Sequence, residues 1–371
     1  MVSDAKQLLK LIHQLPITET IRVINVCGGH ERSITHAGLR SLLPKYIDLI
    51  PGPGCPVCIC PEEDIYQAIQ IALHENVILL AFGDLFRVPV NTPINGVRSL
   101  DEAKAKGANI HAIASPIEAL SMAQKHPECT IVFFVAGFET TCAPVAAMLS
   151  EGIPQNLLLL MSGRLTWPAV NMLLNSDEQN FDALIAPGHV ATIMGFEQWR
   201  FVTTKYQIPT AVAGFTSESL LCALYSVLRQ HIENTIFLDN TYTQVVQASG
   251  NLKAQQLLTR AFSIVDATWR GIGIIPNSGY ELAEHLSANN ARLYFPEYTH
   301  QARKNAGTMP PGCDCAKVIL GQIKPHACAL YGRTCSPRTP IGPCMVSDEG
   351  ACKIWWSSGI ENTEDKISLL D

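Results

Sequence analysis

The chain carries little charge and no excess of positive charge. Only 16% of its 371 residues are Asp, Glu, Lys or Arg, and the formal net charge is −6. Proteins that bind a nucleic-acid backbone normally have a surplus of lysine and arginine, so we expect no nucleic-acid partner. Hydrophobic residues make up 47% of the chain. A chain this apolar can bury a large core, which excludes general disorder.

Long hydrophobic runs are also missing. The longest, such as 77–82 and 157–161, are far shorter than the ~20 residues that a membrane-spanning helix needs. The first residues include Asp4 and Lys6 and contain no apolar segment followed by a small-residue cleavage site, so we expect no signal peptide. We therefore expect a soluble, cytoplasmic protein without a membrane partner, in a compartment where thiols stay reduced.

Short apolar segments alternate with amphipathic ones over the first two thirds of the chain. Six apolar segments end at or near a glycine: 21–26, 77–82, 131–135, 157–161, 183–185 and 211–213. Between them, residues 64–74 have helical spacing, and residues 115–118 have the spacing of a capping box with proline at the first helical position. This alternation is typical of parallel α/β structure.

A weak internal repeat predicts two related α/β domains. Residues 50–57 resemble residues 185–190, although glycine after a strand is common in any α/β protein. From Gly307 onward the chain is rich in Gly, Pro and Cys and needs a crosslink to hold it together. The expected domains are residues 20–130, residues 131–215, and a third formed by residues 1–19 with 216–371.

Six of the thirteen cysteines lie within forty residues near the C-terminus: Cys313, Cys315, Cys328, Cys335, Cys344 and Cys352. Structural zinc sites usually contain C-x₂₋₄-C pairs, because a tight turn presents two sulfurs to one small ion. Cys315, Cys328, Cys335 and Cys352 are instead separated by 12, 6 and 16 residues. An iron–sulfur cubane can collect thiolates from separate loops, so the spacing favours a [4Fe-4S] cluster over structural zinc or free thiols.

A C-x-x-C pair, Cys55 and Cys58, lies in the sequence GPGCPVC at 52–58. Such a pair can close to a disulfide and reopen, and its thiolates can also bind soft metals. Two ordinary loop cysteines are the alternative, but the surrounding glycines and prolines would then serve no purpose. Cys60 lies outside the pair, and we expect it to be a bystander.

The motif CGGH at 27–30 comes where a parallel strand is expected to end, at the edge where α/β folds hold ligands. Cys27 offers a thiolate, and His30 offers an imidazole that can act as a ligand or a proton carrier. Asp84, Glu139 and His189 also follow strand-ending glycines; they either cap helices or line one cleft with Cys27. The chain contains no G-x-x-x-x-G-K-[ST] motif, which argues against a P-loop nucleotide site.

Together these motifs resemble the HypD family of hydrogenase maturation factors, nearly end to end. The N-terminal matches are residues 27–30, 52–58, 82–89, 137–141 and 186–190. The C-terminal matches are residues 324–326, Cys328, Gly332, Cys335, 345–347 and 349–352. The resemblance implies an α/β fold of two similar parallel-sheet domains plus a helical, Cys-rich iron–sulfur domain.

The resemblance also implies a function. A member of this family would be a redox-active scaffold on which the Fe(CN)2CO group of [NiFe]-hydrogenases is assembled with the small chaperone HypC and the cyanide donor HypE. Cys27 would hold the iron together with a cysteine of HypC, and we add the hypothesis that His30 hydrogen-bonds a cyanide or carries a proton. Cys55 and Cys58 would be redox thiols that could also bind iron.

By the same resemblance, the [4Fe-4S] cluster would be held by Cys315, Cys328, Cys335 and Cys352, with no role assigned to Cys313 and Cys344. Two rival readings stay open at this point. One is a freestanding iron–sulfur thiol–disulfide oxidoreductase in which Cys27 is incidental, and the other is a purely structural zinc protein.

Overall fold

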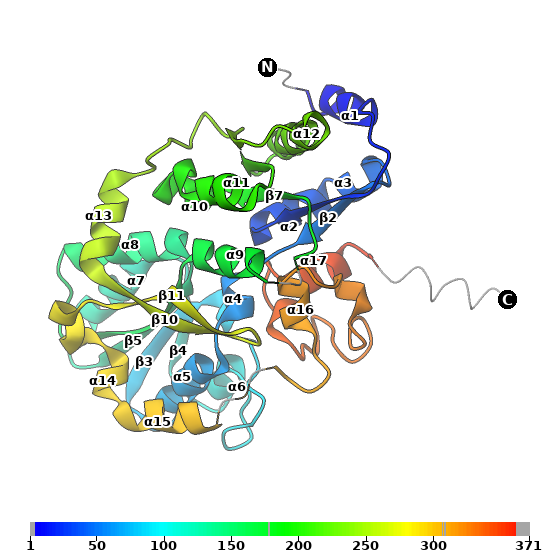
Figure 1. The fold of residues 1–371 in the computed structure, drawn as a ribbon. Coiled ribbons are helices and arrows are strands. Elements are labelled where there is room, and N and C mark those ends of the chain that lie inside the picture. Colours follow the sequence, from blue (N-terminus) through cyan, green and yellow to red (C-terminus); the bar gives the residue numbers. More distant parts are fainter. Residues whose placement is uncertain (1–3, 177–178, 306, 308, 361–371) are drawn as a thin grey trace.

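The computed structural model describes residues 4–176, 179–305, 307 and 309–360. It contains two β-sheets covered by helices, with the C-terminal Cys-rich region packed at their junction (Figure 1). The expected α/β class, with parallel-rich sheets and a Cys-rich C-terminal region, is confirmed. No helix among the described residues has the length and apolar character to cross a membrane.

The first sheet has five parallel strands in the order β2-β1-β7-β8-β9. The strands are β1 (Ile21–Asn25), β2 (Ile47–Pro51), β7 (Ala183–Pro187), β8 (Thr210–Ala213) and β9 (Leu238–Asn240). One apolar layer joins the sheet to α1 (Ala5–His13), α2 (Gly28–His36), α3 (Leu39–Leu42) and α12 (Ser217–Glu233). The opposite layer joins it to α9 (Thr166–Leu174), α10 (Gly188–Met194) and α11 (Arg200–Tyr206).

The second sheet has six strands in the order β10-β11-β6-β5-β3-β4. Four are parallel: β3 (Val77–Phe82), β4 (Ile110–Ile113), β5 (Thr130–Gly137) and β6 (Leu157–Arg164). The hairpin of β10 (Phe262–Trp269) and β11 (Gly273–Leu282) extends the sheet in antiparallel fashion. One face is covered by α7 (Pro116–Lys125), α8 (Glu139–Ser150) and α13 (Leu252–Ala261).

The other face of the second sheet is covered by helices that pack together with most of the C-terminal cysteines. They are α4 (Pro56–Ile59), α5 (Glu62–His74), α6 (Leu100–Ala105), α14 (Ala291–Tyr294) and α15 (Pro296–Asn305). The same apolar layer contains the Cys-rich region with α16 (Cys315–Ile319) and α17 (Ala351–Ser357). Cysteines from the two ends of the chain therefore share one core.

Each sheet combines strands from both of the ranges 20–130 and 131–215. The first sheet takes β1 and β2 from the earlier range and β7 and β8 from the later one, while the second sheet takes β3 and β4 from the earlier range and β6 from the later one. Neither sheet is thus built from one range alone. The division of the chain into three domains stays a prediction.

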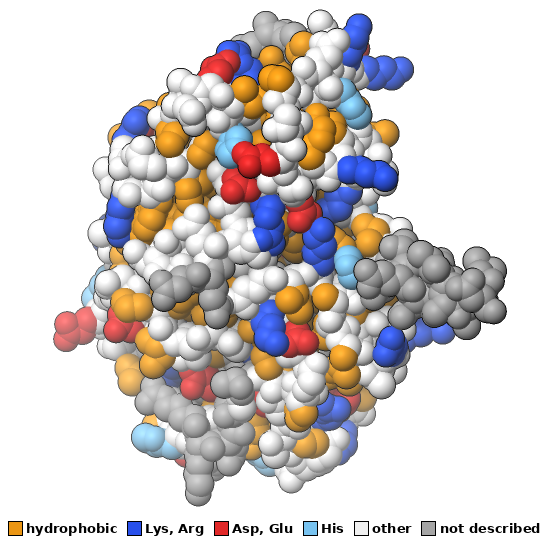
Figure 2. All heavy atoms as spheres, turned by 45° about the vertical axis from the view of Figure 1, so that its right-hand side comes forward, with side chains coloured by type: hydrophobic (Ala, Val, Ile, Leu, Met, Phe, Trp, Pro, Cys, Tyr) orange, Lys and Arg blue, Asp and Glu red, His pale blue; other side chains and the backbone are white. Residues whose placement is uncertain are grey.

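Side-chain contacts hold the Cys-rich region against both sheets. The Asp84 carboxylate, just after β3, accepts hydrogen bonds from the Ser347 hydroxyl at 3.0 Å and the Asp348 backbone N–H at 3.3 Å. On the first sheet's side, the Trp355 indole N–H of α17 donates to Glu31 of α2 at 2.5 Å. On the face turned forward in Figure 2, basic and acidic side chains lie among hydrophobic ones, without a broad area of one charge.

Candidate metal and thiol site

Cys27 and the Cys55–Cys58 turn lie side by side because they follow neighbouring parallel strands. β1 pairs with β2 in register up to Asn25 opposite Pro51, so the segments that follow leave the sheet at the same edge. The backbone N–H of Gly28 donates to the carbonyl oxygen of Gly54 at 3.0 Å. A Cβ atom on Gly54 would lie 2.3 Å from the Cα of Cys27, so only glycine allows this approach.

Cys55 and Cys58 are joined by a disulfide bond, with their Cα atoms 5.3 Å apart. Cys55 caps the short helix α4, and Pro56 occupies its first turn. A cavity of about 10 Å³, enough for about one water molecule, lies between this pair and Cys27. Its lining includes Cys27, Cys55, Cys58 and Cys344, together with Glu31 and Glu349.

Burial governs the ionisation of the groups around Cys27. Burial, with the nearby charge of Glu349, raises the pKa of the Cys27 thiol to about 12, although the backbone N–H groups of His30 and Gly29 act in the opposite direction. Burial, with the charge of Asp84, raises the pKa of Glu349 to about 7, and Arg32 acts against this. Cys27 as a residue keeps partial solvent exposure.

His30, in the first turn of α2, is fully buried, and its Nε2 atom is 3.0 Å from the carbonyl oxygen of Ala213. Its Nδ1 atom has no hydrogen-bond partner among the described residues. Burial lowers the pKa of His30 to about 4, so the ring is neutral at physiological pH. Phe215 contacts His30 and stacks on His189, with ring centroids 4.8 Å and 3.7 Å apart respectively. His30 is therefore a neutral imidazole that does not line the cavity.

Three buried thiols form the core of the C-terminal cysteine group. The Sγ atoms of Cys315, Cys344 and Cys352 all lie within 4.8 Å of one another. The Sγ atom of Cys313 lies 3.3 Å from that of Cys315. Hydrogen bonds to Cys315 and Cys352 hold the pKa of Cys344 below its ordinary value. A group of close, buried sulfur donors fits a soft metal ion or an iron–sulfur cluster.

The backbone around these thiols is shaped to let them converge. A Cβ atom on Gly342 would lie 2.4 Å from the Sγ of Cys313 and 2.5 Å from the Sγ of Cys315. A Cβ atom on Gly350 would lie 2.1 Å from the carbonyl oxygen of Cys344. Both glycines thus permit a close approach of backbone to cysteine. The close, buried thiols of Cys315, Cys344 and Cys352 fit a bound metal ion or iron–sulfur cluster.

The cysteine set that the structure groups differs from the set inferred from the sequence. Cys315 and Cys352 lie together as expected, but their near neighbour is Cys344, which had no assigned role. Cys328 and Cys335 are buried in the same region and lie outside the close group, and the Cys335 sulfur accepts a hydrogen bond from the Ile341 N–H at 3.4 Å. The close approach of Gly350 to the Cys344 carbonyl, which brings Cys344 into this group, has no counterpart in the spacing of the cysteines along the chain.

Cys344 connects the two sites. It belongs to the close thiol group and also lines the cavity between Cys27 and the Cys55–Cys58 disulfide. By contrast, Asp84 and Glu139 do not line this cavity. Asp84 anchors the Cys-rich region, and Glu139 is fully buried, where it accepts hydrogen bonds from the backbone and hydroxyl of Thr166 at 2.8 Å and 2.6 Å.

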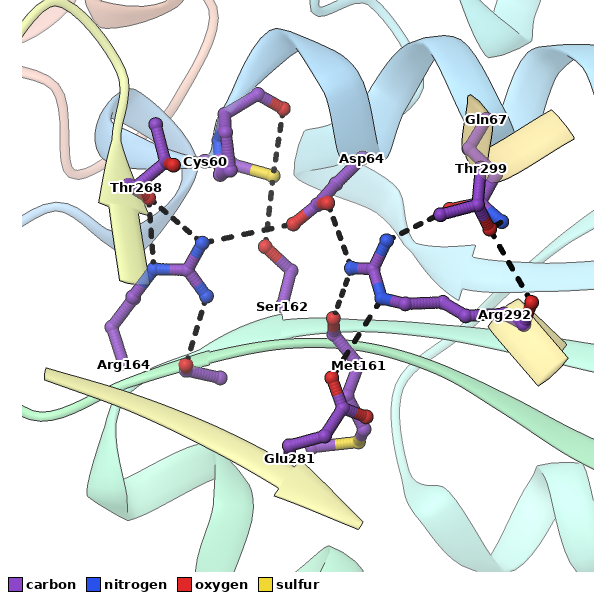
Figure 3. Close-up of polar contacts among 12 residues, drawn as sticks. Cys60, Asp64, Gln67, Met161, Ser162, Arg164, Thr268, Glu281, Arg292 and Thr299 are labelled. Atoms are coloured by element: carbon purple, nitrogen blue, oxygen red, sulfur yellow. Dashed lines mark hydrogen bonds and ion pairs between the residues drawn. The ribbon is translucent and has the colours of Figure 1, made fainter. Parts of the chain in front are cut away.

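A second, polar cavity of about 270 Å³ lies beside helix α5. Figure 3 shows how Asp64 of α5 lies between two arginines, with Arg292 at 2.7 Å and Arg164 at 3.7 Å. Cys60 lies beside this network (Figure 3): its sulfur is 3.4 Å from the Ser162 hydroxyl, and burial raises its pKa to about 12. Cys60 is therefore a protonated core thiol that helps to fix the segment between α4 and α5.

Comparison with known proteins gives one consistent result. The family model described as "HypD: Hydrogenase formation hypA family" matches residues 3–359. The hydrogenase maturation factor HypD of Escherichia coli (strain K12) is 36% identical over 348 residues, which cover 93% of this chain and 91% of that protein.

Two further relatives are similar over comparable lengths. HypD of Azotobacter vinelandii is 37% identical over 348 residues, covering 91% of this chain and 89% of that protein. A putative hydrogenase expression/formation protein of Methanocaldococcus jannaschii is 35% identical over 342 residues, covering 91% and 92%. With the motifs at 27–30 and 52–58 brought together at one sheet edge, and a buried cysteine group beside them, the chain belongs to the HypD family of hydrogenase maturation factors.

Proposed function

We propose that this chain is a cytoplasmic, redox-active scaffold on which the Fe(CN)2CO group of [NiFe]-hydrogenases is assembled, together with a HypC-type small chaperone and a HypE-type cyanide donor. The observation that carries the proposal is the cavity where Cys27, the Cys55–Cys58 disulfide and Cys344 meet. In this proposal the iron is cargo that the scaffold receives and passes on.

Cys27 is the proposed anchor for that iron. Low-spin Fe(II) with cyanide and carbonyl ligands is a soft centre that thiolates bind well. Cys27 begins helix α2 at a sheet edge and keeps partial exposure, so a cysteine of the small chaperone could reach the same ion. One sulfur from each protein would hold the iron without enclosing it, which suits cargo that must leave.

Cys55 and Cys58 are the proposed store of two electrons. Reduction of their disulfide takes two electrons and two protons and yields two thiols beside Cys27, which could then also bind the iron. Glu31 and Glu349 are among the residues that line the same cavity. A disulfide that can be reduced and two glutamates thus line one small cavity.

His30 is proposed to carry a proton rather than to bind a cyanide. When its Nε2–H donates to the Ala213 carbonyl, the Nδ1 atom carries a lone pair and can only accept a hydrogen bond. A cyanide nitrogen is itself an acceptor, so this tautomer offers it no donor. The free lone pair can accept a proton, but burial lowers the pKa of the ring to about 4, so in this role His30 would hold a proton only briefly.

The C-terminal cysteines are proposed to hold a [4Fe-4S] cluster, with Cys315, Cys328, Cys335 and Cys352 as the first candidates for its ligands. When bound, such a cluster supplies electrons one at a time. The position of Cys344, in the wall of the cavity and next to Cys315 and Cys352, supports a short distance between the cysteine group and the disulfide.

The test is infrared spectroscopy of the full chain purified without oxygen together with its small chaperone. We expect absorption bands of iron-bound cyanide and carbonyl, and we expect Cys27→Ala to remove them. If the parent protein and Cys27→Ala both contain an iron–sulfur cluster but neither gives these bands, the scaffold proposal is contradicted. That result would favour the freestanding thiol–disulfide oxidoreductase. Colourless protein that contains zinc would contradict both.

A further inference from the structure

Arg270 is a fully buried arginine at the junction between the second sheet and the cysteine region. It follows β10 directly, and none of its side chain is exposed. Its backbone N–H donates to the carbonyl oxygen of Ile59, at the end of α4, at 2.9 Å. Its guanidinium donates to the carbonyl oxygen of Pro89 at 2.9 Å and lies 3.9 Å from the Glu62 carboxylate.

The turn that carries Arg270 packs directly on the cysteine region. The next residue, Gly271, has a φ of +75°, and a Cβ atom there would lie 2.9 Å from the Cβ of Ala316, which follows Cys315 in α16. Burial lowers the pKa of Arg270, and the Glu62 carboxylate and ionised thiolates of Cys60, Cys315 and Cys313 act in the opposite direction. Arg270 thus brings a positive charge to the edge of the cysteine group, inside the apolar core.

A metal group held by thiolates would place negative charge in this core. Cys315, Cys344 and Cys352 are all buried within the same apolar cluster. Negative charge in an apolar interior is costly unless a positive charge lies nearby, and net charge is one of the factors that set the reduction potential of iron–sulfur clusters.

We propose that Arg270 is the buried counter-charge of the metal-bound cysteine group, and that it raises both the affinity for the metal group and its reduction potential. The inference rests on the proposed function for the identity of that group. The Glu62 carboxylate should lower both the affinity for the metal group and its reduction potential. It accepts the Asn91 backbone N–H at 2.5 Å with one oxygen and faces Arg270 with the other, so it partly cancels the positive charge.

The arginines of the polar cavity provide a matched comparison. Arg292 is also largely buried next to the second sheet, but Asp64 pairs with it at 2.7 Å and Glu281 lies 3.8 Å away (Figure 3). Two carboxylates therefore offset its charge locally. Loss of Arg292 should weaken the fold as loss of Arg270 does, without a specific effect on the cysteine group.

The experiment compares Arg270→Gln, Arg270→Lys, Glu62→Gln and Arg292→Gln in the full-length chain. The first measurement is the affinity of metal-free protein for Cd²⁺, from its thiolate charge-transfer absorption, with the Cys55–Cys58 disulfide left oxidised so that this pair does not compete. The second is the midpoint potential of the natural metal group, from a redox titration without oxygen. Thermal unfolding of each variant reports its stability.

We expect Arg270→Gln to weaken Cd²⁺ binding about tenfold and to lower the midpoint potential correspondingly, by about 59 mV for a one-electron couple. Arg270→Lys should stay within about threefold of the parent, and Glu62→Gln should shift both quantities in the opposite direction. Arg292→Gln should change neither. If Arg270→Gln fails to fold, the opposite shift in Glu62→Gln still decides the question.

Unchanged affinity and potential in both Arg270→Gln and Glu62→Gln would overturn the inference, as would equal losses in Arg270→Gln and Arg292→Gln. Failure of the proposed function gives a different result. Purified protein without iron or sulfide would refute the proposed cluster. If the Cd²⁺ affinity still falls in Arg270→Gln and rises in Glu62→Gln, the role of Arg270 as counter-charge stands.

Discussion

The N–H of Gly28 and the carbonyl of Gly54 form a 3.0 Å hydrogen bond that joins the segment after β1 to the segment after β2. This bond holds Cys27 next to the Cys55–Cys58 disulfide. The contact leaves no room for a side chain at Gly54, where a Cβ atom would meet the Cys27 backbone at 2.3 Å.

Gly54→Ala should therefore separate the two cysteine motifs. Overpacking of this kind typically costs about 1–3 kcal/mol, so we expect a lower unfolding midpoint and loss of hydrogenase maturation. Urea unfolding and a maturation assay measure the two effects. Gly83→Ala is the control, because no atom lies within 4 Å of a Cβ at Gly83. Equal behaviour of the two variants would refute the close approach.

Variants of single cysteines should separate the two metal sites. Cys27→Ala should keep the visible absorption of the iron–sulfur group and lose maturation, whereas Cys328→Ala should lose the absorption. The same spectra on Cys313→Ala and Cys344→Ala will show whether either of these two thiols is also a ligand. Loss of absorption in Cys27→Ala, with absorption retained in Cys328→Ala, would reverse the assignment of the two sites.

Asp84 should act as an anchor for the Cys-rich region. Asp84→Asn removes the negative charge that accepts hydrogen bonds from Ser347 and Asp348, and hydrogen bonds to charged groups contribute about 1.5–3 kcal/mol. We expect faster amide hydrogen exchange in residues 343–350 and little change in β3. Asp101→Asn, in an exposed first turn of α6, is the control. Unchanged exchange in 343–350 would show that the anchor is dispensable.

His30 should make stability depend on pH. Its pKa is about 4 in the folded protein and 6.5 when unperturbed, so between these values the unfolded chain holds a proton that the native ring does not. Stability from this group is complete above pH 6.5 and falls as pH decreases towards 4, by about 3 kcal/mol in all. Unfolding of metal-free protein against pH measures this. His30→Gln should show a shallower loss on acidification, and parallel curves would contradict a buried neutral ring.

The convergence of Cys27 with Cys55 and Cys58 follows from features that a sequence can reveal. The segment before Cys27 was among the predicted strands, although the one before Cys55, which forms β2, was not. Neighbouring parallel strands end at one edge of a sheet. The order of the strands is harder to foresee. β1 pairs with β7, more than 150 residues away, and this pairing depends on tertiary packing rather than local pattern.

The grouping of Cys344 with Cys315 and Cys352 also depends on tertiary structure. Spacing along the chain said nothing about the fold-back at Gly350 that brings the Cys344 backbone against α17. Arg270 is a similar case. A single arginine after a strand has no motif around it, and only the packing of its turn on Ala316 places it beside the cysteines.

The cavity between Cys27 and the disulfide takes its walls from both ends of the polypeptide, with Asn25 at one end and Ala351 at the other. During translation the early motifs emerge long before Val318, Cys344 and Glu349, which complete the enclosure. Domains generally fold as their segments become available, from the N-terminus onward. The complete cavity therefore cannot form on a nascent chain that still lacks these residues, and whatever it is proposed to hold can be loaded only after they have been synthesised.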